Sequence, residues 1–447
     1  MNSKVYILII SLLSIYGIKM NAQEKVPVDI MPIESPFPMP QLKRPSFPNR
    51  IVNIAEAGAK QNVPCTTIIQ KSINALAQKG GGTICIPKGK WISGRITLKS
   101  NIELRIEEGA ELHFSGNVDD YQPAVLTRYE GIDLYSLGAM IYACNAENIA
   151  VTGKGKLIAP SRNCEISQRQ AGGVSEDLNH IPLSKRVFRG LNGETVFMPV
   201  FFGPVNCKNI LVEGVTFEHS IFWNISPVYC ENIIIRDIRV NSYGAGRTDG
   251  IDIDSSCNVL IEYVTLDCGD DCFVLKAGRG LDGIRKNQPT ENIVIRHCRA
   301  IRGVGGIAIG SETAAMIRNV YVHDCLMEQV NFGVFMKTRR PRGGGAENII
   351  MERVHIKEPR HIAFYWDMLG SKQWVGELAE RFPIREINKL TPKFSNMFFK
   401  DMTVGNCQQL IKATGLPESP IENVVFENLT TNNKIIETQD VSKLTIK

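Results

Sequence analysis

A short cassette of alternating apolar residues recurs along most of the chain. Each copy opens with Asn, continues with apolar and mostly β-branched residues, and ends in a turn. Neighbouring copies often follow at intervals of roughly 20–30 residues, a period typical of solenoids, and the wider gaps read as insertions. One such coil has an apolar face that it cannot bury alone, so coils must stack. We therefore predict an all-β parallel solenoid, whose cassettes begin at Asn148, Asn209, Asn232, Asn258, Asn292, Asn319, Asn348, Asn396 and Asn423.

The cassette Asn suits a solenoid turn for two reasons. Its short side chain tolerates the left-handed backbone conformation, and Asn residues stacked on successive coils can form hydrogen-bonded ladders. A leucine-rich repeat would need Leu at fixed offsets, and a doubly wound fold would need helices between the strands. Neither pattern is present.

The N-terminal part of the chain reads differently from the repeats. Residues 1–23, with Lys4 before an apolar run from Val5 to Leu13, have the pattern of a secretory signal peptide. Residues 24–50 are rich in proline and read as an extended N-terminal arm. A helical periodicity follows Thr66, which we expect to be its N-cap, and we expect this helix to cap the solenoid. Residues 51–447 would then form one β-helix domain.

Composition and charge exclude several classes of protein. The 447 residues carry a formal net charge of only +5, without a basic run interleaved with aromatic residues, which argues against nucleic-acid binding. No stretch after the leader is long and apolar enough to span a membrane. Cysteines stand at equivalent places in the repeats, which is typical of small buried apolar residues. We expect neither a cofactor nor a metal site.

The candidate chemistry lies in residues 247–254 and 268–272. Asp249 and Asp270 are 21 residues apart, about one coil, so Asp249 should stack beside Asp270 and Asp271. Three close carboxylates repel one another, which raises some of their pKa values. Glycoside hydrolysis needs such a set, with one protonated acid for the leaving oxygen and one base for water. Asp252 and Asp254 alternate along the same strand and are at least as readily structural.

These motifs resemble the polygalacturonase family, glycoside hydrolase family 28, in its bacterial form. The resemblance rests on Arg247-Thr248-Asp249, Gly269-Asp270-Asp271 and the stretch from Gly80 to Pro87, and runs from about Val52 to the C-terminus. It implies a right-handed parallel β-helix and hydrolysis with inversion. Asp270 would be the general acid, and Asp249 and Asp271 would position and deprotonate water. Inversion predicts carboxyl separations of roughly 6.5–9.5 Å.

The chain departs from the family at residues that bind the sugar. Val304 stands where the family has His, Phe335 replaces an Arg, and Arg247 replaces an Asn. Losing an Arg removes a bidentate, charge-assisted contact with a uronate carboxylate. Other cations could compensate, although a solvated basic loop is an equal alternative for those after Lys337, and a surface lysine for Lys276. The candidate substrate-binding residues are Lys337, Arg247, Arg340, Arg342 and Lys276.

We therefore predict an exported, monomeric glycosidase that cleaves galacturonate-containing linkages of pectic polysaccharides. A rhamnogalacturonan-type hydrolase of the same family is an alternative, because that branch also lacks the His and the Arg. It tends, however, to carry Asp-Glu in place of Asp270-Asp271. A polysaccharide lyase would use a basic residue as proton abstractor and commonly calcium. A non-catalytic pectin-binding β-helix is the third alternative. Trp366 could stack on a sugar ring, but core packing is the favoured interpretation.

Overall fold

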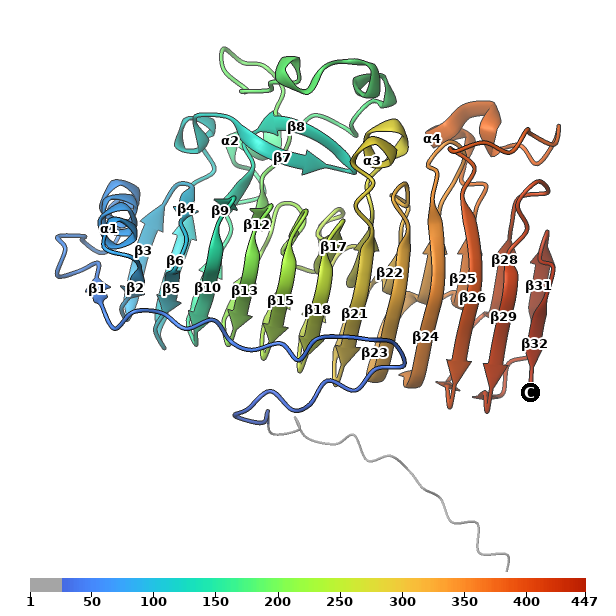
Figure 1. Ribbon diagram of the computed structural model, residues 1–447. Helices are drawn as coiled ribbons and strands as arrows, with labels where there is room; N and C mark the ends of the chain where they lie inside the picture. The colour runs from blue at the N-terminus through green and yellow to red at the C-terminus, as the bar shows by residue number, and fades with distance from the viewer. Residues whose placement is uncertain (1–25) are drawn as a thin grey trace, which may run out of the picture. The chain divides into compact units, whose positions relative to one another are not determined.

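The computed structural model describes residues 26–447, so the predicted signal peptide at 1–23 lies outside the described residues. The chain divides into two units, Met1–Met31 and Pro32–Lys447, and the second contains every helix and strand described below. In this unit, coils of parallel strands follow one another along a single axis (Figure 1). The predicted all-β parallel β-helix is confirmed.

The strands of the described residues form three columns of parallel, hydrogen-bonded strands, one on each side of the coil. The first column runs through β1 (Ile51–Asn53), β2 (Gly82–Ile86), β5 (Ile102–Ile106), β10 (Glu147–Gly153), β13 (Lys208–Glu213), β15 (Glu231–Arg236), β18 (Cys257–Glu262), β21 (Thr290–Arg296), β23 (Ile317–Lys337), β24 (Gly345–Ile356), β26 (Lys393–Lys400), β29 (Glu422–Glu427) and β32 (Leu444–Ile446).

The second column shares parts of the long strands β23 and β24 with the first. Its other members are β3 (Gly89–Ser93), β6 (Ala110–Phe114), β11 (Lys156–Ile158), β14 (Thr216–Glu218), β16 (Arg239–Asn241), β19 (Thr265–Asp267), β22 (Arg299–Ile309), β27 (Thr403–Val404) and β30 (Thr430–Thr431).

The third column carries the candidate chemistry. It also contains the ends of β22 and β23, and isolated bridges at Ile225 and Val228 continue it between β12 and β17. Its other members are β4 (Ile96–Leu98), β9 (Ala139–Cys144), β12 (Val200–Val205), β17 (Ile251–Asp254), β20 (Phe273–Lys276), β25 (Ile362–Asp367), β28 (Gln409–Thr414) and β31 (Ile436–Gln439).

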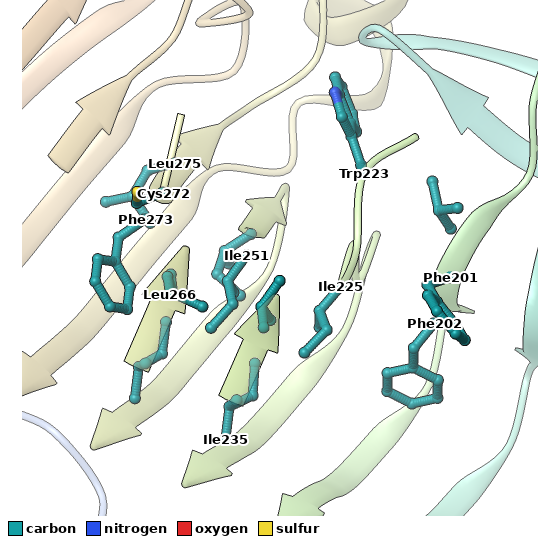
Figure 2. Packing of buried hydrophobic residues seen from close by; sticks show 14 of the residues in the cluster. Phe201, Phe202, Trp223, Ile225, Ile235, Ile251, Leu266, Cys272, Phe273 and Leu275 are labelled. Carbon is teal, nitrogen blue, oxygen red and sulfur yellow. The ribbon is translucent and has the colours of Figure 1, made fainter. Parts of the chain in front are cut away.

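The core is built from the cassettes themselves. The apolar residue after each cassette Asn is buried and pairs in register with its counterpart on the next coil, as Ile210, Ile233 and Val259 do. Each coil thereby covers the apolar face of its neighbour, which a single coil could not bury. Figure 2 shows the same arrangement beneath the third column, where Ile225, Ile251 and Phe273 point into the interior.

The predicted Asn ladder is present. The side-chain amide of each Asn donates to the side-chain oxygen of the Asn on the preceding coil, without interruption from Asn148 to Asn348. All nine cassette Asn residues have a positive φ, which Asn tolerates because its side chain is short and polar. All twelve cysteines are free, and Cys207, Cys230, Cys298 and Cys325 are buried, as expected for small apolar residues in the repeat.

The N-terminal helix α1 (Thr66–Gln78) lies at the open end of the stack, next to β1 to β3 (Figure 1). Ile69, Ile73 and Leu76 are its buried residues. The predicted capping helix is therefore present, but its N-cap is Cys65 and not Thr66. The Thr66 hydroxyl instead accepts the backbone N–H of Gly94, which ties the helix to the following coil.

An insertion between β11 and β12 stands above the coils together with an antiparallel hairpin (Figure 1). The hairpin is β7 (Val125–Tyr129) and β8 (Ile132–Ser136). Short helices line this region and the later loops: η1 (Val118–Tyr121), α2 (Glu165–Gln168), η2 (Glu176–His180), η3 (Leu183–Lys185), α3 (Gly280–Lys286), α4 (Lys372–Val375) and η4 (Gly376–Ala379). Among the described residues, none of the helices has the length and apolarity needed to cross a membrane.

The segment from Pro32 to Arg50 contains neither helix nor strand. Arg44 forms an ion pair with Glu213 on β13 at 2.7 Å, and the Pro32 carbonyl accepts a hydrogen bond from Arg296 on β21 at 2.8 Å. The arm therefore follows the outer side of the first column across several coils.

Candidate active site

The carboxylates Asp249, Asp270 and Asp271 lie on two consecutive turns at the start of β17 and β20. Gly250 donates its backbone N–H to the Asp271 carbonyl at 2.9 Å, which places the two turns on neighbouring rungs. The Thr248 hydroxyl accepts the N–H of Gly269 at 3.0 Å and so links them. A Cβ at Gly269 would lie only 1.8 Å from the Ala245 carbonyl oxygen, so only glycine permits this close approach.

The structure brings the three carboxylates together, as the stacking of one coil on the next predicted. One oxygen from each of Asp249, Asp270 and Asp271 lies within 4.8 Å of the other two. This is shorter than the separation of about 6.5–9.5 Å expected for an inverting enzyme. The physical reason is the fold: Asp270 and Asp271 are consecutive residues on one turn, and Asp249 lies on the neighbouring rung, about 4.8 Å away in a parallel sheet.

Asp270 is the most accessible of the three, since it is half-buried while Asp249 and Asp271 are buried. Its Oδ2 accepts the N–H of Arg247 at 3.0 Å, and its Oδ1 accepts the N–H of Asp271 at 3.0 Å. Burial raises the pKa of Asp270, and the neighbouring Asp271 raises it further. A carboxyl with a raised pKa that solvent can reach is suited to donate a proton.

Asp271 has both oxygens engaged. Its Oδ1 accepts the N–H of Gly305 at 2.7 Å, and its Oδ2 forms an ion pair with Lys337 at 2.5 Å. A Cβ at position 305 would lie 2.8 Å from Oδ1, so glycine allows this hydrogen bond. Burial alone lowers the pKa of Lys337, but Asp271 and Asp270 together outweigh burial and raise it. The cation therefore stays charged beside Asp271.

Asp249 and Asp252 are buried acids whose pKa values lie well above the ordinary range. Burial is the main cause for both, and the charge of Asp252 adds to it for Asp249. Neither oxygen of Asp252 has a hydrogen-bond partner. Because a buried ionised carboxylate without hydrogen bonds is costly, Asp252 favours its protonated form.

This raised pKa predicts how stability depends on pH. Between the unfolded pKa near 3.9 and the higher folded pKa, native Asp252 binds the additional proton, so its contribution to stability falls as pH rises. Asp252→Asn removes this titration. We expect the free energy of unfolding of the variant, relative to that of wild type, to increase by up to about 1.4 kcal/mol for each pH unit above pH 4. Chemical denaturation at pH 4, 5.5 and 7 measures this gain, and a difference independent of pH would contradict it.

Lys276 is buried and serves as an internal counter-ion. Its Nζ lies 3.0 Å from Glu312 Oε2, 3.7 Å from Asp252 Oδ1 and 4.6 Å from the centre of the Trp223 ring. Burial lowers the pKa of Lys276, but the nearby carboxyl groups, Glu312 first among them, outweigh burial and raise it. The prediction that Lys276 binds substrate therefore needs correction, because its ammonium group is buried against Glu312.

Arg247 reaches the cluster with its backbone and not with its side chain. Its guanidinium donates to Glu130 at 2.6 Å and to the Tyr129 hydroxyl at 2.8 Å, both at the end of the β7–β8 hairpin. It also lies 4.9 Å from the centre of the Phe222 ring. The side chain is 30% exposed, so a ligand can still approach it.

The structure does not make Arg340 and Arg342 available to a ligand. Arg340 donates to both carboxylate oxygens of Glu418 and to the carbonyls of Leu378 and Glu380, which occupies its donors within the protein. Arg342 is also buried, with its Nη1 at 3.7 Å from Glu312, and burial lowers its pKa to about 10. The structure therefore places Arg340 and Arg342 inside the protein and not on a solvated loop.

The residues that replace the family His and Arg have other roles here. Val304 donates its backbone N–H to the Asp270 carbonyl at 2.9 Å. Phe335 stacks in parallel on Tyr365, with 5.1 Å between ring centres, and its ring centre lies 4.5 Å from Lys337 Nζ. Trp366 is fully buried, so the interpretation as a core residue is confirmed.

Sequence reasoning missed Gly305, Glu312 and Glu130 as parts of this site. A glycine that donates a backbone N–H leaves no chemical signature beyond the glycine-rich run 303–310. Glu312 and Glu130 lie outside the cassettes, in loops without a period, so nothing in the repeat places them beside Lys276 or Arg247. The three carboxylates could in principle converge on a cation, but Lys337 already provides positive charge at Asp271.

Comparisons with known proteins agree with this geometry. The family model of glycosyl hydrolases family 28 matches residues 192–362, which include all three carboxylates and Lys337. A probable polygalacturonase of Vitis vinifera is 26% identical over 82% of this chain and 70% of its own length. An exo-poly-alpha-D-galacturonosidase of Dickeya chrysanthemi is 25% identical over 69% of this chain and 55% of its own length. The crystal structure of an exopolygalacturonase from Thermotoga maritima superposes with a TM-score of 0.80 at 28% identity, covering 91% of this chain and 94% of the other.

Proposed function

The chain belongs to glycosyl hydrolases family 28 and is a glycosidase acting on O-glycosyl bonds of pectin, and from that premise we propose that it is an exported, inverting hydrolase of galacturonate linkages. The observation that carries the proposal is the convergence of Asp249, Asp270 and Asp271 on neighbouring rungs. Three acids with unequal exposure and unequal partners can divide acid and base roles between them.

Asp270 is the general acid of the proposed reaction. Its raised pKa keeps a proton available, and its partial exposure allows it to reach the oxygen of the bond being cleaved. Two backbone N–H groups, of Arg247 and Asp271, hold its oxygens in place. When the bond breaks, Asp270 gives its proton to the leaving oxygen and becomes ionised.

Asp249 and Asp271 hold and deprotonate the attacking water. Lys337 and the Gly305 N–H contact the two oxygens of Asp271 and fix the orientation of its carboxylate. The short distance between the carboxylate oxygens is the observation that speaks against inversion, and the anomer formed first decides the stereochemistry.

Lys337 is the candidate for the uronate carboxylate of the substrate. An ammonium group has three donors, and Asp271 accepts from one of them. The side chain is 18% exposed, which leaves part of it accessible from the outer surface. One lysine then orients the base and attracts an acidic sugar.

Export is proposed from the leader pattern in residues 1–23, a short apolar run with polar flanks. In an exported enzyme the polysaccharide is met outside the cytoplasm, where a polymer of this size is available. We propose that the enzyme acts as a monomer, because Asp249, Asp270, Asp271 and Lys337 all come from one chain.

Product analysis tests this function. We expect the purified protein to release reducing ends from homogalacturonan, and to release few or none from either class of rhamnogalacturonan. Proton NMR of the early products should show β-anomers formed first from the α-linked polymer, as inversion requires. Cleavage of rhamnogalacturonan alone would contradict the substrate, unsaturated products absorbing in the ultraviolet would indicate a lyase, and α-anomers formed first would exclude inversion.

A further inference from the structure

The tip of the β7–β8 hairpin contacts the turn before β17, which carries Arg247. Tyr129 pairs with Ile132 at the end of the two strands, so Glu130 and Gly131 form a two-residue turn. Both turn residues have a positive φ, as the tightest kind of hairpin turn requires. The mechanism proposed above gives no role to Glu130 or to Tyr129.

Glu130 uses both of its carboxylate oxygens to join separate parts of the chain. Its Oε1 accepts a hydrogen bond from Arg247 at 2.6 Å, and its Oε2 accepts the backbone N–H of Val174, in the insertion, at 3.1 Å. Arg279, which follows β20, donates its backbone N–H to the Gly131 carbonyl at 3.0 Å. Figure 1 accordingly shows the end of β7 next to α3, which begins just after Arg279. The hairpin tip is therefore anchored to β20, the strand that begins beside the carboxylate cluster.

The guanidinium of Arg247 lies against a fixed aromatic surface. It is 4.9 Å from the centre of the Phe222 ring, and it donates a hydrogen bond to the Tyr129 hydroxyl at 2.8 Å. Tyr129 and Phe222 are buried, and their rings stack in parallel with 4.8 Å between the centres. Because a planar guanidinium makes directional contacts with both a carboxylate and a ring face, this side chain is held in one orientation.

The backbone just before Arg247 is open and restrains its N–H little. Residues 243–246 are largely exposed, and a Cβ at Gly246 would meet no atom within 4 Å. Arg247 itself has a φ of 60°, a conformation that costs energy for a residue with a long side chain. Its N–H nevertheless reaches Asp270 Oδ2 at 3.0 Å, one of the two backbone hydrogen bonds to that carboxyl. The orientation of the acid therefore depends on the contacts that hold the Arg247 side chain.

We propose that Glu130 is a positioning residue for the general acid: it holds the Arg247 side chain, and with it the backbone N–H that orients Asp270. The inference rests on the function proposed above and adds a residue to it. The guanidinium then supports the backbone and does not contact the sugar. One departure from the family pattern thereby gains a role, because an Asn at position 247 would be too short to reach both Glu130 and Tyr129.

Two substrates with different leaving groups test this role. Proton donation matters most for an oligogalacturonide, which releases a sugar alkoxide, and least for a 4-nitrophenyl galacturonide, whose phenolate needs little protonation. We expect Glu130→Ala to lower kcat about tenfold on tetragalacturonide, since the acid is misplaced, and about threefold or less on the aryl substrate. KM for the tetramer should change by less than about twofold, because no contact with the sugar is lost. The ratio of the two kcat values does not depend on the folded fraction, so it also tests a variant that folds incompletely.

Double variants show whether Glu130 acts through Arg247 and Asp270. We expect Arg247→Ala to resemble Glu130→Ala, and the double variant to lose no more kcat than Arg247→Ala alone. In the Asp270→Asn background, Glu130→Ala should lower the remaining activity on the aryl substrate by less than about twofold, because no acid is left to orient. Multiplied losses in either double variant would show independent roles and overturn the inference. A raised KM with unchanged kcat in Arg247→Ala would overturn it as well, since the guanidinium would then bind the sugar.

Glu328→Ala is the matched control. Glu328 is half-buried like Glu130, and it binds Arg299 at 2.5 Å on the outer side of the second column. We expect this variant to keep both kcat values within about twofold of wild type, because a surface ion pair contributes little. Equal losses of Glu130→Ala on the two substrates would show a purely structural role and would overturn the inference.

Asp270→Asn alone separates this inference from the proposed reaction. If Asp270→Asn abolishes cleavage of the tetramer while Glu130→Ala keeps wild-type kcat on both substrates, the reaction stands and the positioning role is wrong. If wild type cleaves no galacturonide, or if Asp270→Asn keeps its activity, the reaction is wrong and the positioning role is overturned with it.

Discussion

Asp270→Asn is expected to lower kcat on homogalacturonan by about 10³-fold, which is typical for removal of a general acid. The amide cannot protonate the leaving oxygen, while its shape leaves the turn between Gly269 and Cys272 intact. We expect the melting temperature to stay within a few degrees. Asn loses one of two backbone N–H contacts, but it also removes a charge beside Asp271, and the two effects oppose each other. Reducing-end release and thermal unfolding measure the two quantities.

Asp267→Asn is the matched control for this prediction. Asp267 is an acid on β19, just before the same turn, but it pairs with Arg302 on the outside of the coil at 2.6 Å. A surface ion pair of this kind contributes about 1 kcal/mol or less, so we expect activity and melting temperature near those of wild type. If Asp270→Asn keeps more than a tenth of wild-type kcat, or if both variants lose activity alike, Asp270 is not the acid.

The stacking of Asp249 on Asp271 could be predicted because backbone geometry alone imposes it. Where the step between two motifs equals one parallel coil, their turns must lie one rung apart, whatever the side chains are. The Asn ladder follows from the same argument, since each cassette repeats the same backbone conformation. The repeat therefore predicts which residues share a face and how far apart they lie along the axis.

The partners of the cations could not be predicted, because they lie in segments without a period. Arg247 meets Glu130 on a hairpin far earlier in the chain, and Arg340 meets Glu418 on a later turn. Such loops fold back over the coils by their own packing. Arg340 and Arg342 thus look solvated in the sequence but are buried in the structure.

The contacts of the residues that depart from the family pattern could not be predicted from the sequence either. Phe335 in place of an Arg reads in the sequence only as the loss of a carboxylate contact. The structure adds that Phe335 joins a partly exposed aromatic row with Phe332 and Tyr365. Cross-strand pairing created that row, since Tyr365 belongs to the next coil but is directly adjacent to Phe335 in register. The contacts of a substituted residue in a solenoid therefore depend on the residue in register with it on the next coil.

The buried pair of Lys276 and Glu312 supports the coils beneath the carboxylate cluster. Burial raises the pKa of Glu312, but the charges of Lys276 and Arg342 outweigh burial and lower it, so Glu312 is ionised at neutral pH. Removing one partner of a buried ion pair leaves a buried charge without compensation, which typically costs about 3–5 kcal/mol. Arg342 compensates Glu312 only in part without the lysine, because its Nη1 is 3.7 Å from Glu312 and forms no hydrogen bond.

Lys276→Met is therefore expected to lower the free energy of unfolding by about 3–5 kcal/mol at pH 7, as measured by chemical denaturation. The lowered pKa of Glu312 contributes stability that is present above its unfolded pKa of about 4.5 and is lost as pH falls. In the variant Glu312 takes up a proton more readily, so the defect should shrink towards pH 4. Lys156→Met is the control, because the exposed pair with Glu218 at 3.1 Å should contribute about 1 kcal/mol or less. A defect of the same size in both variants, or one that does not change between pH 7 and pH 4, would show that Lys276 does not compensate a buried charge.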